Sequence, residues 1–341
     1  MTRRVVRLTS TNQPLLDVYS AARRGPPERL SIPQIEQIRR TIRRTPEVMV
    51  KVTGGGRSIR AVAAHIAYIG HHGEVELESD RGERIHEDTQ EEFLRTWHLE
   101  ASPGQYRSKL PARSVASRIK LVHNVVLAMP AGTPPDKVLA AARAFAREKF
   151  SAHRYVLALH THQRHPHVHL VVKAERETEP GRLRIDKAML REWRQDFARA
   201  MREQGVAANA TPRATRGQTK RAAKDVFYRT RQRGQSYALR GELKGIAREL
   251  SRTRTISDPA RAQLLRTRKA VIAGWNALAA KLEAQGEIAL GADARYFAMH
   301  LPPVRTDRER LAAHLIDAKT RNTEKTPEDD NVRDRTLDRS R

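Results

Sequence analysis

The stretch that decides the fold is RYVLALHTHQRHPHVHLVVKAE, residues 154–175. Its two β-prone runs are divided by QRHP at 163–166, and this pattern predicts an antiparallel hairpin. In the register that follows, His162 lies opposite His167 and His160 lies opposite His169. Facing residues, and residues two apart on one strand, share a face of the sheet. We therefore expect these four imidazoles to converge.

Four converging imidazoles are hard to explain as packing, because each disfavours the charged form of its neighbours. A bound cation resolves this conflict, and imidazole ligands favour Mn, Ni, Co or Zn. A phosphodiester oxygen that completes the shell would also suit Mn or Mg. The alternative interpretation is a His-rich surface hairpin without a metal.

The other histidines carry no such pattern. His165 lies in the predicted turn, outside the site, and His123 is interpreted as an ordinary strand residue. Six more are interpreted as surface residues, namely His71, His72, His98, His153, His300 and His314.

Working outward, the chain alternates predicted strands and helices. SIPQIEQIRRTIRR from Ser31 predicts a helix, VMVKV at 48–52 a strand, and TGGGRS at 53–58 a loop. The next helix is capped by Ser58 and ends at Gly70, and helical rotation carries Tyr68 off its apolar stripe. Further on we predict strands at 73–79 and 119–130, and helices at 135–150 and 186–205. Strands mixed with helices indicate an α+β fold.

The predicted organisation has five parts. They are a basic arm and helix at 1–47, an α+β domain at 48–207, a basic linker at 208–224, a mainly helical region at 225–320, and a disordered tail at 321–341.

The charge predicts a polyanionic partner. The 341 residues include 65 Lys and Arg against 39 Asp and Glu, a formal net charge of +26. Residues 206–341 hold 29 of the basic and 16 of the acidic residues, which is half of the excess. A distributed excess favours a nucleic-acid partner over a membrane surface, which more often meets one polybasic run.

Several classes of protein are excluded or disfavoured. The chain has no Cys, which excludes disulfides, thiolate metal sites and cysteine nucleophiles. No apolar run is long enough to predict membrane insertion, and MTRRVVRLTSTNQ has no secretion-signal pattern. We expect a cytoplasmic protein. No GxxxxGK[ST] motif occurs, so no nucleotide-binding P-loop is predicted.

The order of these motifs resembles one known family. TGGGRS, HIAYIGHHGEVELES, NVVLAMPAGTPPDKVLAAARAFAREKF and YVLALHTHQRHPHVHLVV follow one another over about residues 48–215. Together they resemble the relaxases, or mobilisation nucleases, of the VirD2-like kind. The resemblance implies an HUH-type nuclease fold, in which a central antiparallel sheet is flanked by helices.

The resemblance also implies an activity. A tyrosine would attack a phosphodiester at the origin of transfer in single-stranded DNA and form a 5′-phosphotyrosyl adduct. By position this nucleophile is Tyr68, with Tyr155 as the one rival. The metal ligands would be His160, His167 and His169, holding Mg or Mn in function, with Zn, Ni or Co as alternatives. His162 stands where relatives have an acidic residue, and Arg164 occupies a second such position. His162 could act as a base or as a fourth ligand.

The sequence also contains candidate DNA contacts. Basic side chains along the first part of the chain, and one after the last histidine strand, are interpreted as contacts to the DNA backbone. We single out Arg39, Arg43, Arg57, Arg60 and Lys173. The implied partners are accessory origin-binding proteins and a type IV coupling protein, which would pass the DNA-linked protein to a recipient cell.

Three other functions stay open. A rolling-circle initiator or single-strand transposase shares this chemistry, but its His pair usually precedes its tyrosine. A non-catalytic DNA-binding accessory protein would form no adduct. A zinc hydrolase would use water and be indifferent to Tyr68.

Overall fold

The computed structural model describes residues 26–99, 119–219, 237–253 and 255–324. The chain divides into two compact units. Within the described ranges, the first contains residues 32–211, and the second contains residues 26–31 together with residues from 212 onward. Each is described by itself below.

A six-stranded sheet forms the centre of the first unit, with the order β1-β4-β6-β5-β2-β3 and every neighbouring pair antiparallel. Its strands are β1 (Met49–Gly54), β2 (Leu77–Ser79), β3 (Arg84–Ile85), β4 (Val122–Ala128), β5 (Tyr155–His160) and β6 (His167–Lys173). The helices of this unit are α2 (Ile32–Ile42), α3 (Ile59–Ile69), α4 (Gln90–Arg95), α6 (Pro135–Lys149) and α7 (Lys187–Glu203), with the 3-10 turn η1 (His71–Gly73). The predicted α+β class is confirmed.

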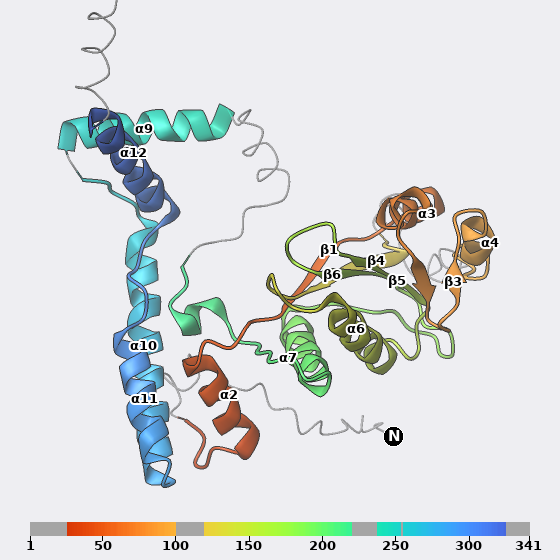
Figure 1. The fold of residues 1–341 in the computed structure, drawn as a ribbon, viewed down its shortest axis with the longest axis horizontal. Helices are drawn as coiled ribbons and strands as arrows, with labels where there is room; N and C mark the ends of the chain where they lie inside the picture. Colours follow the sequence, from red (N-terminus) through yellow and green to blue (C-terminus); the bar gives the residue numbers. More distant parts are fainter. Residues whose placement is uncertain (1–25, 100–118, 220–236, 254, 325–341) are drawn as a thin grey trace, which may run out of the picture. The chain divides into compact units, whose positions relative to one another are not determined.

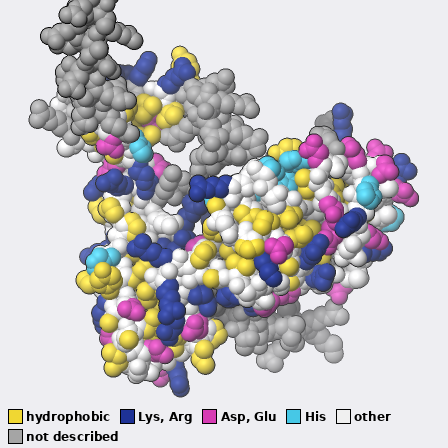
Figure 2. All heavy atoms as spheres, in the orientation of Figure 1, with side chains coloured by type: hydrophobic (Ala, Val, Ile, Leu, Met, Phe, Trp, Pro, Cys, Tyr) yellow, Lys and Arg dark blue, Asp and Glu magenta, His cyan; other side chains and the backbone are white. Residues whose placement is uncertain are grey.

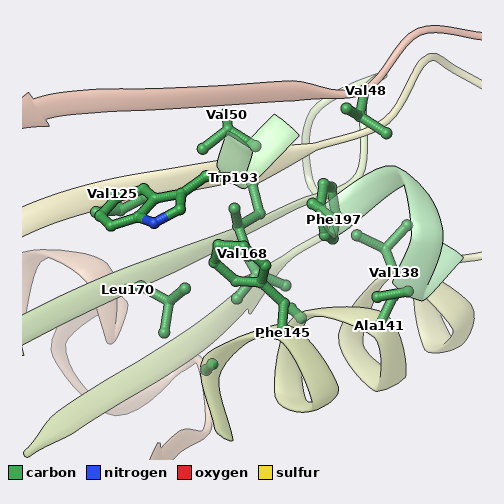
Figure 3. Close-up of a cluster of buried hydrophobic side chains, with 14 of the residues drawn as sticks. Val48, Val50, Val125, Val138, Ala141, Phe145, Val168, Leu170, Trp193 and Phe197 are labelled. Carbon is green, nitrogen blue, oxygen red and sulfur yellow. The ribbon is translucent and has the colours of Figure 1, made fainter. Parts of the chain in front are cut away.

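Helices α6 and α7 cover one face of the sheet (Figure 1). Val168 and Leu170 of β6 point into this layer, where they meet Phe145 of α6 and Trp193 and Phe197 of α7 (Figure 3). All five side chains are buried. Burial of an aliphatic or aromatic side chain of this size contributes roughly 1.5–3 kcal/mol, so this layer is a main source of stability for the sheet.

Helices α3 and α4 pack on the opposite face. Val62 and Ile66 of α3 and Trp97 after α4 are fully buried there against Val156 and Val171 of the sheet. Alternate residues of a strand face opposite sides. His167 and His169 lie an even number of residues from Val171 along β6, so they also point to this side. The layer under α3 therefore holds both an apolar core and, at one end, the histidines.

The β5–β6 register differs from the predicted one. His160 pairs with His167, and Ala158 pairs with His169, so the predicted pairing of His160 with His169 and of His162 with His167 is wrong. β5 ends at His160, and residues 161–166 form a longer connection than the predicted 163–166 loop. The shift is two residues, which keeps each side chain on its predicted face.

The second unit is helical. Its helices are α9 (Tyr237–Thr253), α10 (Ala260–Ala284), α11 (Ile288–Met299) and α12 (Asp307–Glu324), preceded by the 3-10 turn η2 (Arg213–Arg216). The Trp275 ring of α10 lies 5.0 Å from that of Phe297 of α11, and its indole N–H donates to the oxygen of Thr215. This agrees with the predicted helical region.

The division between the units falls inside the range 208–224 that the sequence suggests as a linker. Ala208 and Asn209 are buried in the first unit, where main-chain bonds join Asn209 to Pro46 and Val48. Thr215 is buried in the second. The domain boundaries stay predictions, and residues 325–341 of the predicted tail lie outside the described part of the chain. No helix within the described residues is both long and apolar enough to cross a bilayer.

Candidate active site

Three histidines meet at the end of the β5–β6 hairpin, on the face covered by α3. The ring centroid of His160 lies 5.2 Å from that of His167 and 4.5 Å from that of His169, and the last two are 5.1 Å apart. One ring nitrogen from each of the three lies within 4.8 Å of the others. This spacing suits three ligands of one metal ion.

Two of these rings are oriented by main-chain oxygens. Nε2 of His160 lies 2.7 Å from the oxygen of Ile69, and Nδ1 of His167 lies 2.9 Å from the oxygen of His165. A carbonyl oxygen only accepts, so these nitrogens carry the protons. Nδ1 of His160 and Nε2 of His167 are then left with lone pairs. Such a fixed tautomer is the usual arrangement of a metal-binding histidine.

The three rings are neutral at physiological pH. Burial, together with the smaller effect of the neighbouring imidazoles, lowers the pKa of His160 to about 4 and that of His169 to about 3. Burial also lowers the pKa of His167. A metal ion binds only the deprotonated imidazole. The donor set and its protonation state therefore fit a divalent cation.

Two further histidines join this cluster. His162 is exposed beyond the end of β5, with its ring 5.1 Å from that of His160. His71 lies 4.7 Å from both rings. The interpretation of His71 as an isolated surface residue is wrong, because η1 turns the chain back over the hairpin directly after α3. His71 makes this turn in the left-handed region, with φ 48°.

Tyr68 lies in the last turn of α3. The Oγ of Ser58 caps this helix by accepting the N–H of Ala61 at 3.2 Å, as expected. The Tyr68 side chain is 53% exposed, which confirms that it lies off the apolar stripe. The main-chain oxygen of the next residue, Ile69, is hydrogen-bonded to the His160 ring. Tyr68 therefore lies at the same end of the sheet as the histidines.

His65 is a neighbour of Tyr68 that the sequence reasoning missed. The two rings lie 6.1 Å apart and nearly parallel, at 22°. Nε2 of His65 is buried and has no hydrogen-bond partner among the described residues, and burial lowers the pKa of this ring. The spacing i, i+3 on a helix places the two side chains together, and this signal was present in HIAY.

The remaining aromatic and histidine candidates lie elsewhere. Tyr155 is only 4% exposed, within the core behind α6. The ring of His123 contacts the oxygen of Leu183 at 3.1 Å, and burial lowers its pKa to about 4. The interpretation of His153 as a surface residue is wrong. Its ring is buried, and Nδ1 contacts the oxygens of Lys173 and Glu175.

Three of the predicted DNA contacts lie at the other end of the sheet. Arg57 and Arg60 are exposed where α3 begins, and the preceding residue Gly56 accepts the N–H of Leu121. Lys173 pairs with Val122, six residues along β6 from His167, or roughly 20 Å at the rise of a strand. Its ammonium is buried and lies 2.6 Å from the carboxylate of Glu177. The structure therefore does not bring these residues to the histidines.

The other two predicted contacts lie on α2 and just after it. Arg39 forms an ion pair with Glu36 at 3.3 Å, and Arg43 is exposed. Lys and Arg side chains are scattered over the visible face of the molecule rather than gathered in one patch (Figure 2). This agrees with a charge excess spread along the sequence.

Part of the chain is similar in sequence to known proteins. Residues 78–206 match the family model described as "Relaxase: MobA/VirD2-like, nuclease domain". The chain is 26% identical over 211 residues to the T-DNA border endonuclease VirD2 of Agrobacterium fabrum, covering 58% of this chain and 46% of that protein. It is 25% identical over 186 residues to the VirD2 of Rhizobium rhizogenes, covering 50% and 42%.

The extent of these matches is limited. The VirD2 of Rhizobium radiobacter is 24% identical over 212 residues, covering 58% of this chain and 49% of its own. The chain thus spans about half the length of these curated relatives. The family match contains the β5–β6 hairpin and begins after Tyr68. The role of Tyr68 is therefore argued from the site itself.

Proposed function

We propose that the chain, whose residues 78–206 match the MobA/VirD2-like relaxase nuclease domain, is a site- and strand-specific DNA-nicking enzyme that cuts an origin of transfer and stays linked to the cut strand. One observation carries the proposal. The last residue of the helix that bears Tyr68 is Ile69, whose main-chain oxygen accepts a hydrogen bond from His160. His160 also belongs to a set of three histidines spaced for a metal ion.

The proposed reaction is a transesterification. The phenolic oxygen of Tyr68 attacks the scissile phosphorus and forms a 5′-phosphotyrosyl bond, while the bond from phosphorus to the 3′ oxygen breaks. The leaving oxygen takes up a proton and becomes a 3′ hydroxyl, and the phenolic proton passes to a base. One phosphodiester replaces another, so the step needs no ATP and can be reversed by attack of the 3′ hydroxyl.

Each residue of the site has a proposed role in this reaction. His160, His167 and His169 would hold a divalent ion, which when bound supplies a positive charge beside the phosphate oxygens. Tyr68 is exposed for attack, and His65 packs along its ring and limits where it can turn. His162, exposed beside His71, is the proposed proton acceptor or a further ligand.

The partners and the metal belong to the same proposal. The +26 charge supports binding to single-stranded DNA, with Arg57, Arg60, Arg39 and Arg43 as proposed backbone contacts. Lys173 stays a proposed contact only if DNA displaces Glu177. We further propose Mg or Mn as the working ion, accessory origin-binding proteins and a type IV coupling protein as partners, and a cytoplasmic location before transfer.

The proposal is tested by incubating the purified protein with Mn²⁺ or Mg²⁺ and labelled single-stranded oligonucleotides from candidate origins. We expect a protein–DNA adduct that survives a denaturing gel, with the DNA on Tyr68 by peptide mass mapping. Cleavage without an adduct would indicate water as the nucleophile and a hydrolase. Binding without cleavage of the cognate origin would indicate an accessory DNA-binding protein.

A further inference from the structure

The histidine cluster holds two sets of three that share one member. One set is His160, His167 and His169. The other is His71, His160 and His162, and its ligand atoms also lie within 4.8 Å of one another. Two of its three ring pairs have centroids 4.7 Å apart and the third 5.1 Å, which matches the spacing in the first set.

His160 has only one nitrogen to offer. Its Nε2–H donates to the oxygen of Ile69 at 2.7 Å, so Nδ1 carries the lone pair. A neutral imidazole ligates one metal ion at a time through such a nitrogen. An ion held by the first set therefore takes His160 away from the second set, and the reverse is also true.

The two sets differ in how open they are to solvent. In the first, His160 and His167 are buried and His169 is half-buried, whereas in the second His162 is exposed and His71 is half-buried. Neither set contains a carboxylate. Without a substrate phosphate oxygen in the shell, an all-imidazole site suits Zn²⁺, Cu²⁺ or Ni²⁺ better than Mg²⁺, which prefers oxygen ligands.

We propose that His71, His160 and His162 form a second position for a late transition-metal ion, at the open edge of the cluster. An ion bound there prevents another ion from binding to the first set, because the two sets share His160. The chain then binds one such ion at either of two places. This inference deepens the proposed metal site and rests on that proposal only through the shared His160.

The test is the amount of Zn²⁺ bound by the full-length chain in equilibrium dialysis at low micromolar free Zn²⁺. We expect one ion per wild-type chain. We also expect one ion for the double variant His167→Ala/His169→Ala, because the second set is intact. Adding His71→Ala and His162→Ala to that variant should weaken binding at least tenfold, and His160→Ala alone should weaken it similarly. His165→Ala, which removes an imidazole of the same hairpin that belongs to neither set, should change nothing.

Two results would overturn the inference. One is a folded His167→Ala/His169→Ala variant, checked by circular dichroism, that binds no Zn²⁺. The other is a wild-type chain that binds two ions at once through these histidines. If the double variant does not fold, His169→Gln applies the same test, since it leaves the first set with two ligands. Zn²⁺ binding by His71→Ala/His162→Ala reports on the first set alone, so failure of this inference and failure of the proposed metal site are distinguishable.

Discussion

Nε2 of His160 lies 2.7 Å from the main-chain oxygen of Ile69. This bond joins the last residue of β5 to the last residue of α3, one residue after Tyr68. The main-chain oxygens at the end of a helix carry partial negative charge, which favours a cation nearby. The contact therefore fixes one ligand ring, directs a favourable field at the cluster, and holds the proposed nucleophile at the same end of the sheet.

Replacing the proposed nucleophile should abolish the adduct without disturbing the fold. In Tyr68→Phe the attacking oxygen is gone, so we expect no covalent product on a denaturing gel. The ring is more than half exposed, so the free energy of unfolding should change by less than about 0.5 kcal/mol. The control is Tyr155→Phe, at the buried rival, which should still form the adduct. An adduct in Tyr68→Phe would place the nucleophile elsewhere.

Removing a ligand should separate cleavage from DNA binding. His167→Ala leaves two of the three proposed ligands, so we expect Mn²⁺-dependent cleavage to fall by more than about a hundredfold. Affinity for the oligonucleotide should stay within a fewfold, because phosphate contacts to Lys and Arg dominate binding. Rate measurements and fluorescence anisotropy give the two quantities. His165→Ala keeps the carbonyl that orients His167 and should cleave normally. Normal cleavage by His167→Ala would refute the ligand assignment.

The neutral histidines should make the metal-free protein sensitive to acid. The folded pKa values of His160 and His169, about 4 and about 3, lie below the ordinary 6.5 of an unfolded histidine. Between pH 6.5 and about 4 the unfolded chain therefore binds more protons than the folded one. The free energy of unfolding should fall as the pH drops through this window.

Urea unfolding with EDTA at pH 7.0, 6.0 and 5.0 measures this effect. The variant His169→Gln cannot be protonated at this position, so its stability should fall less steeply over the same range. Equal slopes for the two proteins would show that His169 does not contribute to the acid sensitivity.

The convergence of the histidines could be predicted from the sequence, although the register could not. Strand period alone places His160, His167 and His169 on one face, and a slip of two residues does not change the face. The exact pairing depends on where β5 stops, and six residues connect His160 to His167 where a shorter loop was expected. Loop length is set by how the turn packs, which the local pattern does not contain.

The approach of His71 could not be predicted in the same way. Its place beside His160 depends on how the end of α3 docks on the hairpin, 91 residues away in the chain. Similarly, the sequence suggested Arg57 and Lys173 as contacts to the DNA backbone but did not place them relative to the histidines. The strand register separates them from the histidines by most of the length of the sheet.

The three glycines of TGGGRS should differ in their tolerance of a side chain. A Cβ at Gly56 would lie 2.5 Å from Cγ2 of Val62, and one at Gly55 would collide with the main-chain oxygen of Val122. One at Gly54 would meet nothing closer than 3.8 Å. We expect Gly55→Ala and Gly56→Ala to lower the free energy of unfolding by about 1–3 kcal/mol, and Gly54→Ala to have a much smaller effect. Equal urea midpoints for all three variants would contradict this explanation of the motif.

The distance of Arg57 and Arg60 from the histidines predicts that they act on binding alone. If each contacts one phosphate of single-stranded DNA, the double variant Arg57→Gln/Arg60→Gln should reduce the slope of log K against log salt by about 1.4, since each contact contributes about 0.7. The cleavage rate at saturating DNA should be unchanged, because neither side chain reaches the cluster. Arg84→Gln is the control, as this exposed arginine already pairs with Glu76 at 2.8 Å and should leave the slope intact. A double variant with the wild-type slope would mean that the strand follows another surface of the first unit.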